Sequence, residues 1–460
     1  MKVEQIYTGC LAQGAYYIKS KDEAAIIDPL REIKPYLERA EKDGVKIKYI
    51  FETHFHADFV SGHIDLSKAT GAPIVYGPCA DPAFDALIAC DGQEFKVGDV
   101  TIKALHTPGH TMESTCYLLC DSDGKQQCLF SGDTLFLGDV GRPDLAQVEG
   151  KLTVEDLAGH LYDSLMNKIA ILPDTLIIYP AHGAGSACGK NMMKETFDTL
   201  GNQKQVNYAL KQPDKQTFIR EVLSGLTPPP KYFGLNVMMN KSGYQSVDTV
   251  LSRGMTGLDP EEFERIANDC DALVLDVRST QEFSNGFIPR SINISLDGKF
   301  APWVGAMIVD VNTPILLVTD AGKEEETSIR LSRVGFDNQL GHLRGGIAAW
   351  EKAGKETDKV ERISPNQFLR EISEDASVVF DIRREDEYTA GHVSKAVNMP
   401  LEEINHWIEK ASNAQNLYIH CAGGYRSMIA ASILKSRGIH NFKEVDGGFN
   451  AIKRAKEGIA

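Results

Sequence analysis

Short apolar runs that stop at polar residues mark the first half of the chain. Asp28, Glu52 and Asp133 each stand at or just beyond the end of such a run. Runs of this length, some alternating between apolar and polar side chains, predict β-strands. The predicted strands lie at residues 25–27, 48–51, 100–105, 129–130 and 176–179. Because loops held by rigid strands can converge on one point, the polar residues beyond them are candidates for a common site.

The second half contains an internal repeat. Residues 275–278 match residues 380–383 at an offset of 105, and Gly345-Gly346 recurs as Gly447-Gly448 at a similar offset. Each copy reads as strand, loop, strand and helix, a pattern that predicts a small α/β domain with a parallel sheet.

These patterns predict a multidomain α/β chain with three domains, at residues 1–256, 257–356 and 361–460. Residues 212–256 have poor periodicity and contain three consecutive prolines at 228–230. We interpret this stretch as a linker or as a packed extension of the first domain.

Composition narrows the class of protein. With 460 residues, 42% of them hydrophobic, and a net charge of −15, the chain is typical of a soluble globular protein and lacks the basic balance of a general nucleic-acid binder. No apolar run reaches the roughly 18 residues of a membrane span, and the start, MKVEQIYTGC, does not resemble a secretory signal. We therefore expect a cytoplasmic protein that binds neither nucleic acid nor membrane.

The nine cysteines predict no disulfide framework. Their number is odd, their spacing is irregular and no CxxC pair is present, which also argues against a structural zinc site built from thiolates. Cys10 and Cys188 have no motif around them, and we expect both to be structural.

A set of histidines and aspartates has metal-ligand character. His54, His56 and Asp58 alternate along one stretch, so that in an extended loop their side chains point the same way. Three further residues each follow a short motif beyond a predicted strand or loop: His110, Asp133 and His182. Imidazole and carboxylate ligands together suit zinc, iron or manganese.

The order of these residues resembles the metallo-β-lactamase superfamily, whose pattern is HxHxDH followed by a His, an Asp and a His. The resemblance covers about the first 200 residues and implies an αββα fold. The sixth motif position is Phe59, where di-metal members have a histidine that ligates the second metal. A phenyl ring cannot ligate, which weakens a second metal site.

Persulfide dioxygenases of this superfamily hold one iron through two histidines and one aspartate. The resemblance assigns these roles to His54, His110 and Asp133, with one Fe²⁺ per chain and three coordination positions left for O₂ and a substrate sulfur. The resemblance gives three further residues the role of orienting water or the ligands, or of serving as alternative ligands: His56, Asp58 and His182.

Two further alternatives stay open for this domain. The metal site also fits a Zn²⁺ hydrolase like glyoxalase II, in which a bound hydroxide attacks a thioester. Arg142 resembles a substrate-contacting arginine of the dioxygenases, and its alternative role is a surface salt bridge.

The last repeat contains a reactive-cysteine loop. A predicted strand ends at His420, and Cys421 opens a loop with Gly423 and Gly424 before a helix. Successive N–H groups and the helix dipole favour an anion there, and thus a thiolate, while the loop's Arg426 adds a positive charge.

The spacing Cys-x-x-x-x-Arg resembles a rhodanese, and protein phosphatases usually have a loop one residue longer. The resemblance assigns sulfur transfer to Cys421 and Arg426, and substrate contacts to Gly423, Gly424 and Tyr425. In the first repeat we align Asp320 with the cysteine, and acidic residues follow it in a segment about two residues shorter. Acids would repel an anion, so this copy resembles an inactive rhodanese with a structural or docking role.

The fusion of the two modules resembles bacterial persulfide dioxygenase–sulfurtransferase fusions. It implies oxidation of a low-molecular-weight thiol persulfide by O₂ to sulfite and thiol, coupled to a rhodanese that exchanges sulfane sulfur among persulfide, sulfite and thiosulfate. A homo-oligomer is compatible with the sequence. The alternatives are the zinc thioesterase with accessory rhodanese domains and a non-enzymatic sulfur-relay or sensor protein.

Overall fold

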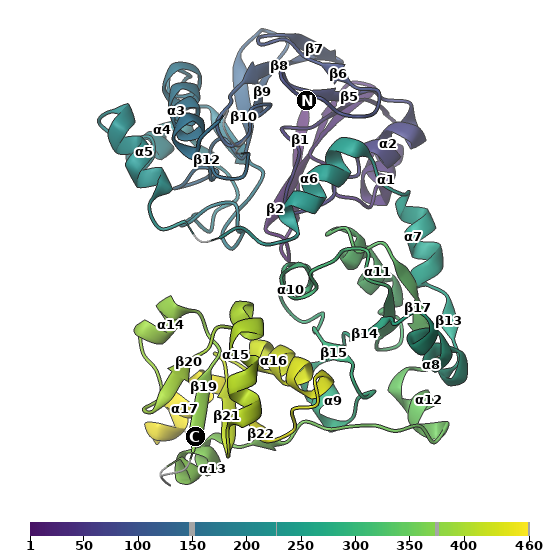
Figure 1. Cartoon of the computed structure of the whole chain (residues 1–460). Helices are drawn as coiled ribbons and strands as arrows, with labels where there is room; N and C mark the ends of the chain where they lie inside the picture. Colours follow the sequence, from purple (N-terminus) through teal and green to yellow (C-terminus); the bar gives the residue numbers. More distant parts are fainter. Residues whose placement is uncertain (147–151, 227, 373–376, 459–460) are drawn as a thin grey trace. The chain divides into compact units, whose positions relative to one another are not determined.

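The structure is a computed structural model that describes residues 1–146, 152–226, 228–372 and 377–458. The chain divides into two compact units (Figure 1). The first is Met1–Val247 with Ser332–Gly335, and the second is Asp248–Leu331 with Phe336–Ala460.

The first unit contains two six-stranded mixed sheets. One has the order β1-β2-β3-β4-β5-β6 and the other the order β12-β11-β10-β9-β8-β7. The strands are β1 (Lys2–Thr8), β2 (Gln13–Ser20), β3 (Glu23–Ile27), β4 (Lys46–Phe51), β5 (Ile74–Tyr76), β6 (Leu87–Ile88), β7 (Glu94–Val97), β8 (Val100–His106), β9 (Thr115–Cys120), β10 (Gln126–Gly132), β11 (Ile177–Pro180) and β12 (Asp198–Thr199).

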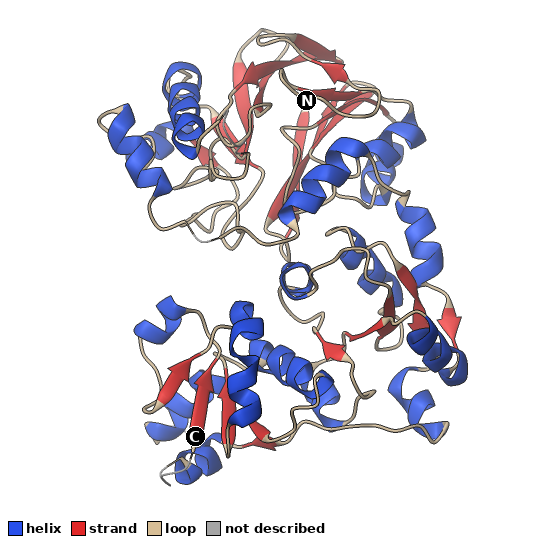
Figure 2. Cartoon of the chain, viewed as in Figure 1, coloured by secondary structure: helices blue, strands red, loops and turns tan. Residues whose placement is uncertain are grey.

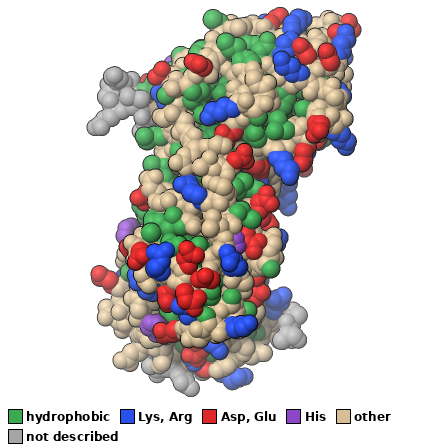
Figure 3. All heavy atoms as spheres, turned by 90° about the vertical axis from the view of Figure 1, so that its right-hand side faces the viewer, with side chains coloured by type: hydrophobic (Ala, Val, Ile, Leu, Met, Phe, Trp, Pro, Cys, Tyr) green, Lys and Arg blue, Asp and Glu red, His purple; other side chains and the backbone are tan. Residues whose placement is uncertain are grey.

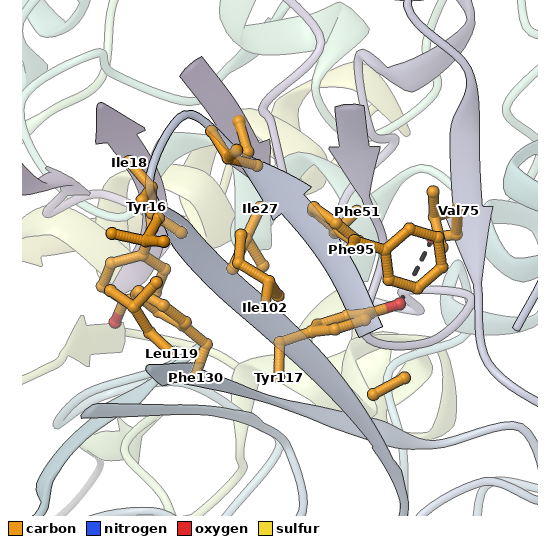
Figure 4. Packing of buried hydrophobic residues seen from close by; sticks show 14 of the residues in the cluster. Tyr16, Ile18, Ile27, Phe51, Val75, Phe95, Ile102, Tyr117, Leu119 and Phe130 are labelled. Carbon is orange, nitrogen blue, oxygen red and sulfur yellow. Dashed lines mark hydrogen bonds between the residues drawn. The ribbon is translucent and has the colours of Figure 1, made fainter. Parts of the chain in front are cut away.

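A shared apolar core joins the two sheets (Figure 4). Tyr16 of β2 packs on Phe130 of β10 with ring centroids 4.9 Å apart, and Phe51 of β4 packs on Tyr117 of β9 at 4.8 Å. The Tyr117 hydroxyl donates a hydrogen bond to the Val75 carbonyl, so the phenol is buried with its polar group paired.

Helices cover the outer faces of the sheets. They are α1 (Lys34–Asp43), α2 (His63–Thr70), α3 (Val154–Ser164), the π-helix η1 (Leu165–Ile169), α4 (Leu200–Val206), α5 (Lys215–Leu223) and α6 (Phe233–Ser242). α1 buries Tyr36 against the apolar side chains of the first sheet, and α3 buries Leu161 against those of the second. Because each sheet buries one face on its partner and the other under helices, the unit has the predicted αββα fold.

The second unit contains two five-stranded sheets in which every pairing is parallel, as predicted. Their orders are β13-β17-β16-β14-β15 and β18-β22-β21-β19-β20. The strands are β13 (Gly257–Leu258), β14 (Leu273–Asp276), β15 (Ile292–Asn293), β16 (Ile315–Val318), β17 (Gln339–Leu343), β18 (Arg362–Ile363), β19 (Val378–Asp381), β20 (Ala396–Asn398), β21 (Leu417–His420) and β22 (Phe442–Val445).

Helices flank these sheets (Figure 2). They are α7 (Val247–Gly254), α8 (Pro260–Asp269), α9 (Thr280–Asn285), α10 (Phe300–Met307), α11 (Glu324–Ser332), α12 (Gly346–Lys352), α13 (Pro365–Glu371), α14 (Glu385–Thr389), the 3-10 helix η2 (Leu401–Glu403), α15 (Ile404–Asn413), α16 (Tyr425–Ser436) and α17 (Gly448–Lys456). In β19, Val379 packs with Phe368 of α13, whereas Phe380 contacts Trp407 of α15. Successive residues of a strand point to opposite faces, so both faces of the sheet are buried.

The sheet register aligns the two repeats exactly at their central strands. Asp276 of β14 pairs with Val318 of β16, and the matching Asp381 of β19 pairs with His420 of β21. Val318 and His420 are therefore equivalent residues of the two repeats.

This register places Thr319, not Asp320, at the position of Cys421. The alignment of Asp320 with the cysteine was wrong because it took residues 316–319 as the strand, whereas β16 ends one residue earlier, at Val318. The backbone of the next residues agrees, since Gly322 has φ +82° and its equivalent Gly424 has φ +103°. Both glycines stand where a left-handed conformation is required.

The segment after this position is shorter in the first repeat, as predicted, but the shortening is not in the loop. Residues 319–323 separate β16 from α11, and residues 421–424 separate β21 from α16. It is the helix that is shorter, with nine residues in α11 against twelve in α16.

Charges of both signs are mixed over the face shown in Figure 3, where Lys and Arg side chains stand among Asp and Glu. Within the described ranges, no helix combines the length and the apolar character needed to cross a bilayer.

Candidate functional site

Three of the predicted ligands meet where strands of both sheets end. His54 follows β4, His110 follows β8 and Asp133 follows β10, and their ligand atoms all lie within 4.8 Å of one another. The Asp133 Oδ2 atom is 3.4 Å from His110 Nε2 and 3.9 Å from His54 Nε2. All three side chains are buried. The structure thus brings together two imidazoles and one carboxylate.

The other ring nitrogen of each histidine is held by the protein. His110 Nδ1 lies 2.8 Å from the Arg142 carbonyl oxygen, which only accepts, so Nδ1 carries the proton. His54 Nδ1 lies 3.0 Å from Thr53 Oγ1, whose own proton goes to Asp28 at 2.9 Å. In both rings, Nε2 is the nitrogen with a free lone pair.

The electrostatics fit a cation at this point. Among the described residues, neither carboxylate oxygen of Asp133 has a hydrogen-bond partner, although the residue is buried. An ionised carboxylate without a partner is costly to bury unless a cation compensates it. Burial and the neighbouring histidines hold the pKa of His54 well below its usual value, so the imidazole is neutral, as a ligand must be.

A second group of potential ligands shares Asp133 with the first. His182 Nε2 lies 3.4 Å from Asp58 Oδ2 and 3.5 Å from Asp133 Oδ1. His56 also lies within reach of this group, but its Nε2 is 3.1 Å from Asp28 Oδ1. His56 is thus already paired with a carboxylate of the β3 end.

Phe59 occupies the sixth motif position beside this group. Its ring is fully buried and packs in a tilted arrangement against His56, with ring centroids 4.3 Å apart. It fills the space with carbon and supplies no ligand atom.

Cys188 is a site residue that sequence reasoning missed. Its Sγ lies within 4.8 Å of ligand atoms of Asp133 and His182, and the residue is buried. Burial, with Asp58 and Asp133 nearby, holds the pKa of the thiol well above its usual value. The sequence feature that could have indicated Cys188 is its position six residues after His182, the last motif histidine, in a glycine-containing loop.

A buried acid–imidazole network behind the site was missed as well. Glu52 lies 3.5 Å from His56 Nε2 and 3.4 Å from His63 Nδ1, and it accepts a hydrogen bond from the Ser61 hydroxyl. The sequence signal for this network was Glu52 itself, an acidic residue directly after the predicted strand at residues 48–51.

Arg142 forms an ion pair in the structure. Its Nε and Nη2 atoms donate to the two carboxylate oxygens of Asp144, each at 2.7 Å, and the side chain is buried. A substrate contact by its guanidinium stays a prediction, while its carbonyl oxygen orients His110.

Within residues 212–256, the part that forms α6 is a packed extension of the first domain. Asn240 Nδ2 donates to the carbonyls of His56 and Phe59 at 2.8 Å, and its Oδ1 accepts from the Ser61 N–H at 2.8 Å. α6 therefore fastens the loop that carries His54 and Asp58.

The Cys421 loop of the second unit has the geometry of an anion cradle. Cys421 is 1% exposed, and its Sγ accepts hydrogen bonds from Gly424 N at 3.1 Å and from the Ser427 hydroxyl at 3.4 Å. A Cβ added at Gly423 would meet no atom within 4 Å, so that side of the loop is open. Donors directed at sulfur favour a thiolate or a persulfide anion.

The remaining predicted residues of this loop have partners. Arg426 donates to both carboxylate oxygens of Glu387, at 2.6 and 2.8 Å, so its charge is compensated within the protein. The Tyr425 hydroxyl donates to the Ser295 carbonyl of the first repeat at 2.7 Å. Substrate contacts by these residues stay predictions.

Comparison with known proteins agrees with this architecture. Residues 8–182 match the metallo-beta-lactamase superfamily, and residues 259–353 and 364–455 each match the rhodanese-like domain. A metallo-beta-lactamase from Staphylococcus aureus is 31% identical, with a TM-score of 0.65, and the match covers 75% of this chain and 98% of that one. The chain belongs to the metallo-β-lactamase superfamily. Its metal domain is followed by two rhodanese domains.

Other relatives cover the metal domain only in part. The hydroxyacylglutathione hydrolase of Rhizobium etli is 38% identical over 163 residues, which are 35% of this chain and 56% of that protein. The chain thus spans little more than half the length of that relative. ETHE1 from Myxococcus xanthus is 26% identical with a TM-score of 0.45, over 53% of this chain and 99% of that one.

Proposed function

We propose that the chain is a persulfide dioxygenase with a sulfurtransferase domain. The overall reaction of the metal domain would be R–S–SH + O₂ + H₂O → R–SH + H₂SO₃, in which the terminal sulfur is oxidised and O₂ is reduced. The rhodanese domain would then exchange sulfane sulfur among persulfide, sulfite and thiosulfate. The substrate would be a low-molecular-weight thiol persulfide.

The observation that carries the proposal is the set formed by His54, His110 and Asp133. Two imidazoles and one carboxylate are the ligands typical of non-haem iron oxygenases, and one Fe²⁺ bound there would supply open positions for O₂ and for a substrate sulfur. Phe59, which adds no ligand beside the second group, favours a single metal.

The protein's own residues would prepare this centre. The Arg142 carbonyl and Thr53 hold the ring orientations of His110 and His54, and burial of all three ligands limits access of water. His182 lies 3.4 Å from Asp58 and 3.5 Å from the other carboxylate oxygen of Asp133, and this group would hold a water or a substrate proton.

In the second unit, Cys421 would carry the sulfane sulfur. The Gly424 N–H and Ser427 hydroxyl are directed at Sγ, and the same donors suit the terminal sulfur of a persulfide anion. Glu324 stands at the position equivalent to Arg426 in the first repeat, and Thr319 at that of Cys421, which supports an inactive first repeat.

A second candidate is a zinc-dependent thioesterase. It is favoured by the hydroxyacylglutathione hydrolases among the relatives and by the second ligand group around His182. In that case two metals, or one zinc, would activate water against a thioester.

Anaerobic purification followed by elemental analysis and paired activity assays separates the two. The proposal expects one iron per chain and O₂ consumption with a panel of glutathione, coenzyme A and bacillithiol persulfides. Thioester cleavage by a zinc-loaded protein without O₂ consumption would overturn it.

A further inference from the structure

A buried carboxyl group lies behind the Cys421 loop. Glu444 of β22 is fully buried, and its Oε1 atom is 2.7 Å from the Ser427 hydroxyl. That hydroxyl is in turn 3.4 Å from Cys421 Sγ. Arg362 of β18 donates to the other oxygen of Glu444, Oε2, at 2.9 Å. A continuous hydrogen-bonded chain therefore leads from the sulfur to a carboxyl group that solvent does not reach.

The Ser427 hydroxyl has one proton but more than one acceptor. It is within hydrogen-bond distance of Cys421 Sγ, of Glu444 Oε1 and of the Gly424 carbonyl at 3.1 Å. With an ionised Glu444, the hydroxyl donates to the carboxylate and can accept from the thiol. With a protonated Glu444, the carboxyl donates to Ser427, whose proton is then free for a thiolate.

We propose that Glu444 is a positioning residue that takes up the proton of the Cys421 thiol through the Ser427 hydroxyl. The inference rests on the proposed sulfur transfer at Cys421, and it adds to that function the group that holds the proton.

The steps balance without an outside reactant other than the sulfur donor. The thiol proton moves to Ser427 Oγ while the hydroxyl proton moves to Glu444 Oε1, which leaves a thiolate and a neutral carboxyl group. The thiolate attacks the sulfane sulfur of the donor, for example thiosulfate. The donor S–S bond breaks, sulfite leaves with the electron pair, and Cys421 becomes a persulfide.

The surroundings of Glu444 suit both protonation states near neutral pH. Burial raises its pKa to about 7, and Asp446 acts in the same direction, whereas Arg362 and the Ser427 hydroxyl lower it. A carboxyl group poised near the operating pH can accept and return a proton in each cycle.

The first repeat lacks this chain of groups. The sheet pairs Arg362 with Glu444 in the last repeat and Gly257 with His342 in the first. The residue equivalent to Ser427 there is Glu325. The carboxyl, the hydroxyl and the cysteine are thus absent together, which links Glu444 to the chemistry of the sulfur rather than to the fold of the repeat.

The test is the pH profile of iodoacetamide labelling at Cys421 in the iron-loaded full chain, followed by peptide mass spectrometry. Two coupled groups titrate in two macroscopic steps. We expect the labelling rate of the wild type to rise with pH in two steps, and that of Glu444→Gln to rise in a single step. In Ser427→Ala the labelling rate on the lower step should fall roughly tenfold, because the thiolate loses a hydrogen-bond donor. His342→Gln, at the matching position of the first repeat, should keep the wild-type profile.

Glutamine keeps the size of Glu444 and a hydrogen bond to Ser427, so a purely structural role would leave the labelling profile unchanged. A two-step profile in folded Glu444→Gln, or a single step in wild type, would overturn the inference. If Glu444→Gln does not fold, an unchanged lower step in Ser427→Ala has the same consequence. Failure of thiosulfate to load sulfur on a Cys421 with the two-step profile would instead overturn sulfur transfer and leave the Glu444 assignment standing.

Discussion

In His54 and His110, the ring nitrogen Nδ1 is hydrogen-bonded within the protein, and Nε2 is left to bind a metal ion. Thr53 and the Arg142 carbonyl decide which nitrogen that is. His56, two residues from His54, has the same side chain but lies against Asp28 and Glu52. At the residue scale, the hydrogen-bond partner therefore distinguishes a proposed ligand from its neighbour in the same motif.

We predict that His110→Ala loses iron and O₂ uptake with little loss of stability, because one of three proposed ligands is removed from a loop. Iron content by elemental analysis and uptake at an oxygen electrode measure this, with His160→Ala on α3 as a control outside the site. Uptake at the wild-type rate in His110→Ala would contradict the ligand assignment.

Neither Asp320→Cys nor Thr319→Cys should create a sulfur-carrying first repeat. The register makes Thr319 the proper position, but Glu324 stands at the position of Arg426 and more acids follow. An acidic helix start repels a persulfide anion. Mass spectrometry after thiosulfate treatment checks this, with Cys421 of the same chain as the positive control, and a stable persulfide at position 319 would show the prediction to be wrong.

At the scale of elements, α6 completes the metal domain. Its residue Asn240 satisfies three backbone groups of the loop after β4, and that loop carries His54, His56 and Asp58. A helix from outside the recognised motif thus holds the backbone of the ligand loop in place.

We predict that Asn240→Ala lowers the free energy of unfolding of the first unit by about 3 kcal/mol, because it leaves buried backbone groups unpaired. Thermal or denaturant unfolding of the full chain measures the change. Asn202→Ala, at an exposed position of α4, is the matched control. Equal stability of the two variants would mean that water replaces Asn240 without cost.

At the scale of the whole molecule, the two kinds of chemistry belong to separate compact units. The proposed iron ligands lie in the first unit, and Cys421 lies in the second. Each site is built from hydrogen bonds within its own unit, so a change at one should leave the other intact.

Cys421→Ser should accordingly keep its iron and its O₂ uptake, while its product shifts from thiosulfate toward sulfite. Chromatographic analysis of sulfite and thiosulfate after persulfide oxidation decides this. An unchanged thiosulfate yield would place the sulfur transfer elsewhere, with Cys188 and Cys10 as the next cysteines to replace.

Several features followed from the sequence alone. Short apolar runs that stop at polar residues predicted the strands β3 and β4, an alternating run predicted β8, and the repeat predicted two parallel α/β sheets. The resemblance of the histidine and aspartate pattern to the metallo-β-lactamase superfamily implied which side chains lie together. These features are local or periodic, and a layered fold brings the ends of its strands together at only a few edges.

Other features depended on the tertiary structure. Only the pairing of β14 with β16 showed that Thr319, rather than Asp320, is equivalent to Cys421, because register depends on the neighbouring strand. Cys188 and Glu444 carry no motif, and their closeness to Asp133 and to Ser427 arises from loops and strands that fold together. The sequence determined which chemical groups are present, whereas the packed sheets decided which of them touch, since contacts between distant residues exist only in the folded chain.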